Sequence, residues 1–510
     1  MEAKEKFIEA IKSSYSFKGE SLLLGSAIWG DDQETGCQVR VPLKTMNRHG
    51  LIAGATGTGK TKSLQLIAEG LSDAGVPVLV MDVKGDLSGI AAPGAMNPVV
   101  EKRSKLIGLE WKPKGYPSEL MTISDEPGVR LKATVSEFGP ILLGKILDLN
   151  ENQTGILSMV FKYCDDKRLP LLDIEDLKTV LKYIQEDGKA EFQKNYGFFQ
   201  TTSAGTIMRS ITSLEQQGAA RFFGEPSFDI FDLMRKDREG NGMVNILRVT
   251  DIQSSTAMFS TFMLCMLAEI FQKMPEKGDV DKPELVIFFD EAHLIFRNAT
   301  KTLLDQFEIT VKLIRSKGVG IILVTQSPDD IPAEVLGQLG LKVQHALRAF
   351  TARDRKAIKL AAENYPVSDF YVADELIMKM GTGEAMVTVL NDKGMPAELV
   401  HTLMRPPFSR MDVLTRDEIG DIVHRSELIS HYNRDIDRES AHEILLEKME
   451  EQDALEEKAR RKAGTQGSTT RSRSTRQVST FERIMKSPLT RTVAREVTRG
   501  VLGALGLSRR

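Results

Sequence analysis

Cysteine is scarce in this chain, and long apolar runs are missing. The 510 residues contain three cysteines, and Cys37, Cys164 and Cys265 stand far apart in the sequence. This distribution matches no metal-ligand spacing and fits a reducing cytoplasm. No apolar run approaches the roughly 18 residues that a membrane span needs. Met1–Lys12 alternates charged and apolar residues, which excludes the core of a signal peptide. We therefore expect a cytoplasmic protein without a membrane span.

Charge is unevenly distributed along the chain. Hydrophobic residues make up 41% and charged residues 27%, which is ordinary for a soluble globular protein of about two to four domains. Residues 458–510 hold 14 Lys and Arg against 2 acidic residues, whereas the rest of the chain holds 54 against 69. A basic tail on an acidic body favours a polyanionic partner or an acidic docking surface within the protein. A solvated tail without a partner is the alternative.

Residues 54–61 form a complete phosphate-binding loop that matches G-x-x-x-x-G-K-[ST]. A short apolar run precedes the loop and a helical apolar pattern follows it, which is the strand, loop and helix order that this motif needs. We expect Lys60 to reach the β- and γ-phosphates and Thr61 to ligand Mg²⁺. A glycine-rich turn without a nucleotide is the alternative. The expected nucleotide-binding residues are Gly54, Ala55, Thr56, Gly57, Thr58, Gly59, Lys60, Thr61 and Lys62.

A second apolar run, Leu285–Phe289, leads directly into two carboxylates. The first, Asp290, is a candidate magnesium ligand through the water shell of the ion. The second, Glu291, is a candidate general base that polarises the attacking water. The alternative is a strand that ends in surface acids. His293 completes an Asp-Glu-Ala-His string, but the other motifs of the helicases named for that string are missing. We therefore expect His293 to be a supporting polar residue or the start of a helix.

Four further residues are candidates for supporting roles in catalysis. Gln326 ends the strand pattern Gly320–Thr325, where it could sense the γ-phosphate, or it could be a turn residue before a proline. Arg315 and Arg348 are candidates for an arginine finger supplied across a subunit boundary, although a surface ion pair is the alternative for each. Asp82, at the carboxyl end of another strand, could contact a metal-bound water or cap the next helix.

The pattern of apolar residues divides the chain into six segments. Residues 135–240 show helical spacing and few strand patterns, so we predict a helical insertion within an α/β core. We also expect a hairpin around residues 391–394. The predicted segments are a β-rich lead-in at 1–47, the first part of the ATPase core at 48–134, the helical insertion at 135–240, the second part of the core at 241–410, a charged helical segment at 411–463, and a basic linker with an amphipathic end at 464–510.

These motifs together resemble the HerA/FtsK superfamily of ring-shaped DNA translocases, and are most similar to bacterial HerA-like ATPases of the YjgR type. The resemblance rests on Gly54–Thr61, Asp82–Asp86, Phe288–His293 and Ile321–Pro328. It implies a P-loop NTPase fold of the ASCE class, with a parallel-rich α/β sheet and the catalytic glutamate on its own strand. It also implies ATP and Mg²⁺ as ligands, hexamerisation, and duplex DNA in a central channel.

The resemblance is incomplete, and three functions therefore remain open. HerA begins with a β-barrel that contacts a partner nuclease, whereas a lead-in of only about 47 residues precedes the ATPase core here, so a nuclease partner is uncertain. The first hypothesis is a hexameric DNA translocase or helicase. The second is an ATPase that acts on protein, as a secretion-type motor or an assembly factor. The third is a nucleotide-dependent scaffold, against which the intact Glu291 argues. No base-reading motif is present, so we expect binding that ignores DNA sequence.

Overall fold

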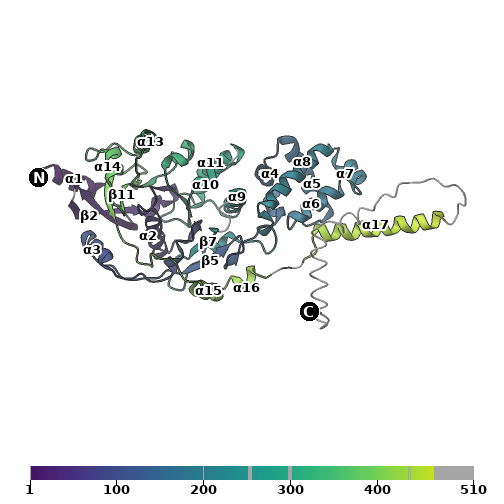
Figure 1. Cartoon of the computed structure of the whole chain (residues 1–510), viewed down its shortest axis with the longest axis horizontal. Helices are drawn as coiled ribbons and strands as arrows, with labels where there is room; N and C mark the ends of the chain where they lie inside the picture. The colour runs from purple at the N-terminus through teal and green to yellow at the C-terminus, as the bar shows by residue number, and fades with distance from the viewer. Residues whose placement is uncertain are drawn as a thin grey trace.

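One twelve-stranded sheet runs through the computed structural model, which describes residues 2–30, 32–198, 200–250, 256–296, 301–434, 436 and 438–464 (Figure 1). The strand order across the sheet is β2-β1-β12-β11-β10-β3-β9-β8-β4-β7-β5-β6. The strands are β1 (Ser21–Trp29), β2 (Asp32–Pro42), β3 (Gly50–Ala53), β4 (Val78–Asp82), β5 (Ser118–Thr122), β6 (Val129–Arg130), β7 (Val244–Arg248), β8 (Leu285–Phe289), β9 (Val319–Thr325), β10 (Leu341–His345), β11 (Glu384–Thr388) and β12 (Val400–Met404).

The strands from β10 to β6 are parallel, and those at the centre are buried on both faces. Every residue of β3, β4, β8 and β9 is buried. This explains why these strands read as continuous apolar runs in the sequence. The predicted α/β fold with a parallel-rich sheet is confirmed. The short strands β5 and β6 were not predicted.

The other end of the sheet is antiparallel and contains the first and last strands of the core. β11 and β12 form the predicted hairpin, and β12 pairs with β1, which pairs with β2. Strand β2 runs without a break through Glu34–Gly36, and its pairing with β1 shifts register between Ser26 and Ala27. Helix α1 (Glu2–Ser14), which precedes these strands, was not predicted; it buries Phe7 and Ile11 against them.

Helices cover both faces of the sheet. Successive residues of a strand point to opposite faces, so each central strand contributes to both cores. On β3, Ile52 joins the core beneath α1 and α2, whereas Leu51 and Ala53 join the core beneath α9 and α11. The remaining α-helices are α2 (Lys60–Asp73), α3 (Pro98–Ile107), α4 (Val135–Ile146), α5 (Glu151–Lys167), α6 (Ile174–Tyr183), α7 (Lys189–Tyr196), α8 (Thr201–Gln216), α9 (Thr256–Lys273), α10 (His293–Phe296), α11 (Lys301–Ile314), α12 (Ala333–Leu336), α13 (Ala352–Glu363), α14 (Ala373–Lys379), α15 (Arg416–Arg425), α16 (Ile429–Tyr432) and α17 (Ala441–Gly464).

Helices α4–α8 form a compact lobe that extends from the sheet, and the start of α17 packs on it (Figure 1). Leu445 and Met449 of α17 are buried in the same core as this lobe. Asp176 accepts a hydrogen bond from the backbone of His442, which fixes the start of α17. The predicted basic end of the chain lies outside the described residues, apart from Gly464. In the described part of the chain, no helix is both long and apolar enough to span a membrane.

Candidate nucleotide-binding and hydrolysis site

The glycine loop lies at the carboxyl end of β3, between the ends of its two neighbouring strands. The backbone N–H of Gly54 donates to the carbonyl of Thr325 at the end of β9, at 3.3 Å. The N–H of Ala55 donates to the carbonyl of Ala346, just beyond β10, at 2.9 Å. Both adjoining strands therefore fix the start of the loop, and α2 begins at Lys60. An anion bound at this helix start would meet the positive end of the helix dipole.

Gly54 is required by a close approach as well as by its backbone angle. Its φ is +154°, and a Cβ there would lie 2.5 Å from the Cβ of His345. The buried imidazole of His345 in turn bonds the hydroxyl of Ser63 through Nε2 at 2.8 Å and the carbonyl of Glu384 through Nδ1 at 2.8 Å. Burial lowers the pKa of His345 to about 4, so the ring is neutral and braces the loop against β10 and β11. The motif gives no hint of this support.

Lys60 is buried at the centre of the loop. Its Nζ donates to the carbonyls of Gly54 at 2.7 Å and Ala55 at 3.1 Å, so the ammonium lies inside the curve of the loop. Burial lowers the pKa of Lys60, and the nearby charge of Lys84 acts in the same direction. Two neighbouring ammonium groups beside the loop favour a polyanionic ligand. Lys62 instead points outward and donates to the carbonyl of Met411 at 2.5 Å.

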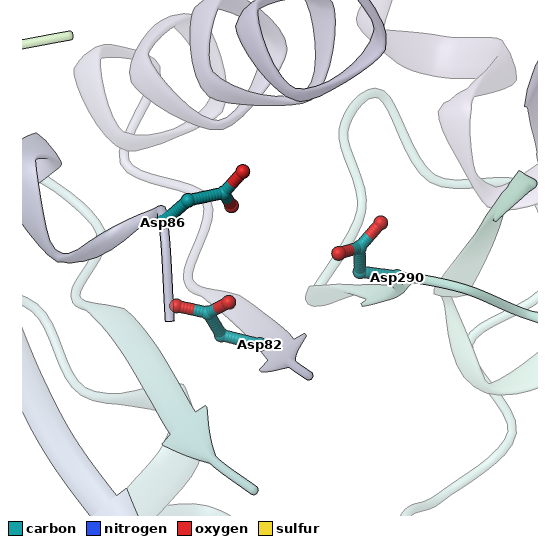
Figure 2. A group of neighbouring side chains, drawn as sticks. All are labelled: Asp82, Asp86 and Asp290. Carbon is teal, nitrogen blue, oxygen red and sulfur yellow. The ribbon is translucent and has the colours of Figure 1, made fainter. Parts of the chain in front are cut away.

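Three carboxylates meet at the carboxyl ends of β4 and β8, beside the loop (Figure 2). Asp82, Asp86 and Asp290 each offer an oxygen, and these oxygens lie within 4.8 Å of one another. Asp82 accepts hydrogen bonds from the backbone of Gly85 at 2.7 Å and Leu87 at 3.2 Å, so it supports the turn that carries Asp86.

The remaining carboxylate oxygens fit a magnesium ion. Oδ2 of Asp290 and Oδ1 of Asp86 are buried without a hydrogen-bond partner. Burial raises the pKa of Asp290 to about 7, and the neighbouring carboxylates add to this rise although the charge of Lys84 opposes it. The Thr61 hydroxyl lies 3.4 Å from Oδ2 of Asp86. Hard oxygen ligands of this kind suit Mg²⁺, and Thr61, Asp86 and Asp290 are the residues that would hold it.

Glu291 follows β8 in a left-handed backbone conformation, with a φ of +51°. Its carboxylate forms an ion pair with Lys84, lies 3.1 Å from Nδ1 of His293, and accepts a hydrogen bond from Nε2 of Gln326 at 3.5 Å. Burial acts to raise the pKa of Glu291, but the hydrogen bond and charge of Lys84, with His293 and Lys60, lower it overall. Glu291 is therefore held ionised, as a general base requires.

A family model described as the C-terminal region of HerA-like helicases matches residues 29–510. The chain belongs to the HerA-like helicase family. The DNA double-strand break repair helicase HerA of Sulfurisphaera tokodaii is 24% identical over 75% of this chain and 69% of that protein. HerA of Sulfolobus acidocaldarius is 20% identical over 69% of this chain and 64% of that protein. The DNA import protein CedB of the same organism is 24% identical over 73% and 54%, respectively. The chain thus spans about two thirds of the HerA relatives.

The fold of this HerA-like chain is shared with solved structures. The bacterial conjugative coupling protein TrwBdeltaN70 aligns with a TM-score of 0.53 and 13% identity, over 79% of this chain and 94% of that chain. Its complex with sulphate aligns with a TM-score of 0.52 and 14% identity, over 80% and 94%, respectively. At this level of identity, the likeness supports the P-loop ATPase fold.

The two arginine candidates lie at opposite ends of the parallel strands. Arg315 stands just before β9, at the edge away from the glycine loop, and its Nη2 lies 3.9 Å from Oδ1 of Asp279. Arg348 follows β10 at the edge that carries the loop, and donates to the carbonyls of Met378 and Met380 at the end of α14. In the described part of the chain, neither arginine forms a hydrogen bond or ion pair with the loop or with Glu291. A finger role for either one remains a prediction.

The sequence predicted the glycine loop and the strand that leads into Asp290 and Glu291. It did not predict the ion pair through which Lys84 contacts Glu291. The structure brings Lys60, Asp290, Glu291 and Gln326 to one edge of the sheet. The available signal was the run of charged residues around Lys84, which follows a strand directly. Because β4 and β8 are adjacent parallel strands, charges at their carboxyl ends meet.

Proposed function

We propose that this HerA-like chain is an ATP-driven motor that translocates or unwinds duplex DNA. One observation carries the proposal: a single edge of the sheet holds Lys60 in the glycine loop, Glu291 after β8, and Gln326 after β9. β9 lies between β3 and β8, so the base stands on a strand separate from the loop. A water molecule bound between Glu291 and the terminal phosphate would complete a hydrolytic site.

Hydrolysis follows from the roles of these side chains. Glu291 accepts a proton from the water as its oxygen attacks the γ-phosphorus, and the bond to the β–γ bridging oxygen breaks to release ADP and phosphate. Gln326 orients the water, and Lys60 stabilises the negative charge on the phosphate oxygens. Magnesium, when bound by Thr61, Asp86 and Asp290, supplies a Lewis acid that neutralises phosphate charge.

The DNA substrate is supported by the named relatives, which are helicases and a DNA import protein. The same site could power movement of a protein, because hydrolysis itself does not specify the cargo. We propose a hexameric ring, in which Arg315 or Arg348 of one subunit reaches the phosphates bound by its neighbour. Such a finger contributes about 10³–10⁵ in rate.

The test measures phosphate release by the full chain, with and without duplex DNA, at low and moderate salt. We expect DNA to stimulate hydrolysis and salt to weaken the stimulation, because phosphate contacts release counterions. Glu291→Gln should lower kcat about 10²–10⁴-fold while nucleotide still binds. Glu9→Gln, which changes an exposed glutamate on α1, is the matched control and should behave as wild type. A rate indifferent to duplex DNA at low salt would favour a protein substrate. A species that stays monomeric with ATP would exclude the ring.

A further inference from the structure

The outer face of α13 is basic, and its charged side chains have no partners. Four exposed residues form this surface, which we call the α13 basic face: Arg353, Arg355, Lys356 and Lys359. In the described part of the chain, none of their side chains forms a hydrogen bond or an ion pair. Ile358 and Ala361 pack inward, so the charges spread over the opposite side of the helix. Of the two acidic residues of α13, Asp354 is bound within the cap at the start of the helix. The α13 basic face is therefore open to an anionic ligand.

An exposed aromatic ring stands directly before this helix. Phe350 is 87% exposed, and among the described residues its ring contacts no other aromatic ring. Its backbone N–H donates to Oδ2 of Asp354 at 2.9 Å, so the helix cap holds the backbone of Phe350 in place. An apolar residue just before a helix cap often packs against the residue five places further on, which is Arg355 here. Because that residue is charged and the ring stays exposed, local packing does not account for Phe350.

The α13 basic face lies close to the candidate hydrolysis site. α13 follows β10, and the carboxyl end of β10 lies beside the carboxyl end of β3, where the glycine loop begins. α13 also packs against the short turn Pro328–Asp330, which comes two residues after Gln326. A ligand held on the α13 basic face would therefore lie next to the segment that carries Gln326.

Unpaired cations beside an exposed ring suit an unpaired nucleic acid strand. Basic side chains bind phosphates whatever the base sequence, and an aromatic ring stacks on the face of an unpaired base. Within a duplex, each base is already stacked on its neighbours, so the ring finds no free base there. We propose that the α13 basic face binds the phosphates of a single DNA strand and that Phe350 stacks on one of its bases. This inference rests on the proposed DNA substrate, and it adds the form of the strand and the surface that holds it.

Acidic side chains around α13 favour a strand over a membrane surface as the ligand. Asp329 is exposed in the turn that α13 contacts, and Glu363 is exposed at the end of α13. A flat anionic bilayer would meet these carboxylates together with the cations, and like charges would repel. A single strand can follow the cations alone. α13 has 12 residues and is about 18 Å long, so a few nucleotides span the α13 basic face.

The first experiment measures binding by the full chain without nucleotide, using fluorescence anisotropy of a labelled oligothymidine of about 20 nucleotides over a range of salt concentrations. We expect Arg355→Gln combined with Lys359→Gln to weaken binding. The slope of log K against log salt should become shallower by about 1.4, because each phosphate contact to a single strand contributes about 0.7. Lys189→Gln combined with Lys194→Gln, which changes two exposed lysines of α7, is the matched control and should bind as wild type. An unchanged affinity and slope in the α13 double variant would overturn the inference.

The second experiment tests the ring. Phe350→Ala should weaken oligothymidine binding about 5- to 150-fold, which is the measured range for the loss of one stacked base. The affinity for a duplex of the same length should change little, because a duplex offers no free base. Phe198→Ala removes a ring that is 75% exposed elsewhere on the chain, and this matched control should bind as wild type. Equal losses for strand and duplex, or no loss for either, would contradict stacking by Phe350.

A third measurement uses a variant that keeps the aromatic ring. Phe350→Trp should retain the affinity for oligothymidine, and its indole fluorescence should be quenched as the strand binds, because the indole stacks on a base. Phe198→Trp is the control and should show no quenching beyond that of the wild-type chain. If Phe350→Trp binds the strand without any added quenching, the ring does not stack on a base.

The outcomes separate this inference from the proposed function. If the wild-type chain binds duplex DNA but not oligothymidine, the inference fails and the proposed motor stands. If it binds neither at low salt, the proposed DNA substrate itself fails. If the α13 double variant keeps its affinity for oligothymidine but loses binding to vesicles that contain phosphatidylserine, the α13 basic face takes lipid headgroups and the inference is overturned.

Discussion

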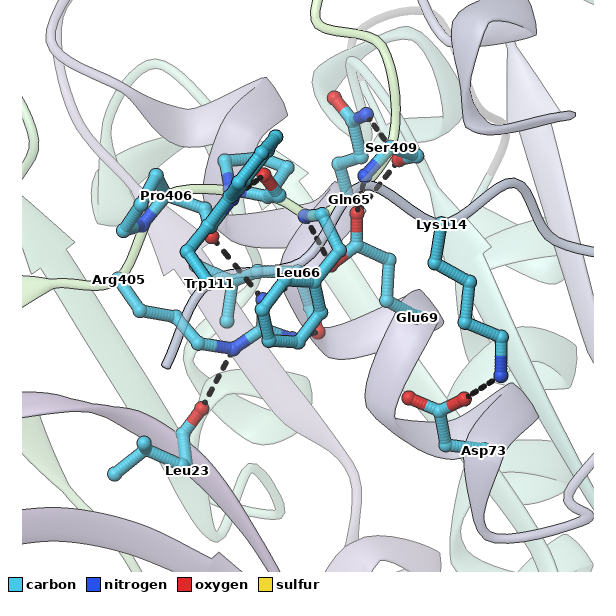
Figure 3. A network of polar contacts seen from close by, with 12 residues as sticks. Leu23, Gln65, Leu66, Glu69, Asp73, Trp111, Lys114, Arg405, Pro406 and Ser409 are labelled. Carbon is cyan, nitrogen blue, oxygen red and sulfur yellow. Dashed lines mark hydrogen bonds and ion pairs between the residues drawn. The ribbon is translucent and has the colours of Figure 1, made fainter. Parts of the chain in front are cut away.

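Two buried charged clusters flank helix α2, and they differ in how their polar atoms are satisfied. On the outer side, Glu69 is fully buried and accepts four hydrogen bonds, from Arg405, from the backbone of Phe408, and from both the backbone and hydroxyl of Ser409 (Figure 3). On the inner side, Asp290 is equally buried, yet its Oδ2 has no partner (Figure 2).

The hydrogen bonding of the two clusters indicates different roles. A buried charge without partners is costly, and a bound cation would offset that cost at the inner cluster. Glu69 and Arg405 tie the chain after β12 to α2 and need nothing more. Beside the loop, Asp86 and Asp290 each keep one oxygen without a hydrogen-bond partner, and a metal ion would satisfy these oxygens. Completed pairing marks the outer cluster as a structural clasp, whereas the incomplete pairing of the inner cluster supports the proposed metal site.

The largest expected effect comes from neutralising the inner cluster. Asp290→Asn should lower kcat by at least about a hundredfold, because a bound metal contributes several kcal/mol of transition-state stabilisation. Phosphate release over a range of Mg²⁺ concentrations provides the measurement. Asp281→Asn, which alters an exposed aspartate before β8, is the control. Near-normal hydrolysis by Asp290→Asn would remove the metal role from the inner cluster.

Breaking the outer cluster should affect stability. Glu69→Gln leaves Arg405 buried without its counter-charge, and we expect a loss of about 3–5 kcal/mol in the free energy of unfolding, measured with urea. The exposed pair of Glu101 and Lys105 is the matched control, and Glu101→Gln should leave the free energy of unfolding almost unchanged. If Glu69→Gln costs as little as the control, the clasp does not stabilise the fold.

The stability of the folded chain should depend on pH through Asp290 of the inner cluster. The pKa of Asp290 is raised to about 7 in the folded chain, so the folded state binds its proton more tightly than the unfolded state does. Its contribution to stability is therefore fully present below about pH 4 and is lost as the pH rises through 7. Without Mg²⁺, Asp290→Asn should be more stable than wild type by up to about 4 kcal/mol at pH 8 and about equal near pH 4. A difference that does not vary with pH would contradict this.

The smallest effect concerns Lys84, the cation that does contact the inner site. Lys84→Met removes the charge that lowers the pKa of Glu291, so the base should stay protonated to higher pH. We expect the acidic limb of the kcat profile to move to higher pH, with a loss of rate below the limb. Lys84→Arg should restore the wild-type profile. An unmoved limb in Lys84→Met would show that the ion pair does not tune the base.

The sequence predicted the elements whose information is local. The glycine loop, the apolar strands and the hairpin of β11 and β12 are each encoded within a few consecutive residues. Asp290, Glu291 and Gln326 were found because each follows a buried strand directly. The family resemblance implied that the catalytic glutamate follows a strand of its own, and the sheet order, with β9 between β3 and β8, agrees with this.

Contacts between distant segments could not be predicted from one sequence. Glu69 lies in the middle of α2 and reads as a solvated helix position, yet Arg405 buries it from 336 residues away. His345 ends a strand pattern and gives no sign that it braces the loop. β5 and β6 are short strands near the edge of the sheet with weak patterns. The burial of such residues is decided by tertiary neighbours, which local spacing does not reveal.

The clasp between Glu69 and Arg405 also has a consequence for synthesis. The ribosome makes Arg405 336 residues after Glu69, and translation at about 5–20 residues per second separates them by about 17–70 s. Throughout that interval the outer face of α2 has neither its cation nor the chain that covers it. The packing around α2 is therefore complete only after residues 405–409 have been made. Until then we expect nascent chains to depend on chaperones.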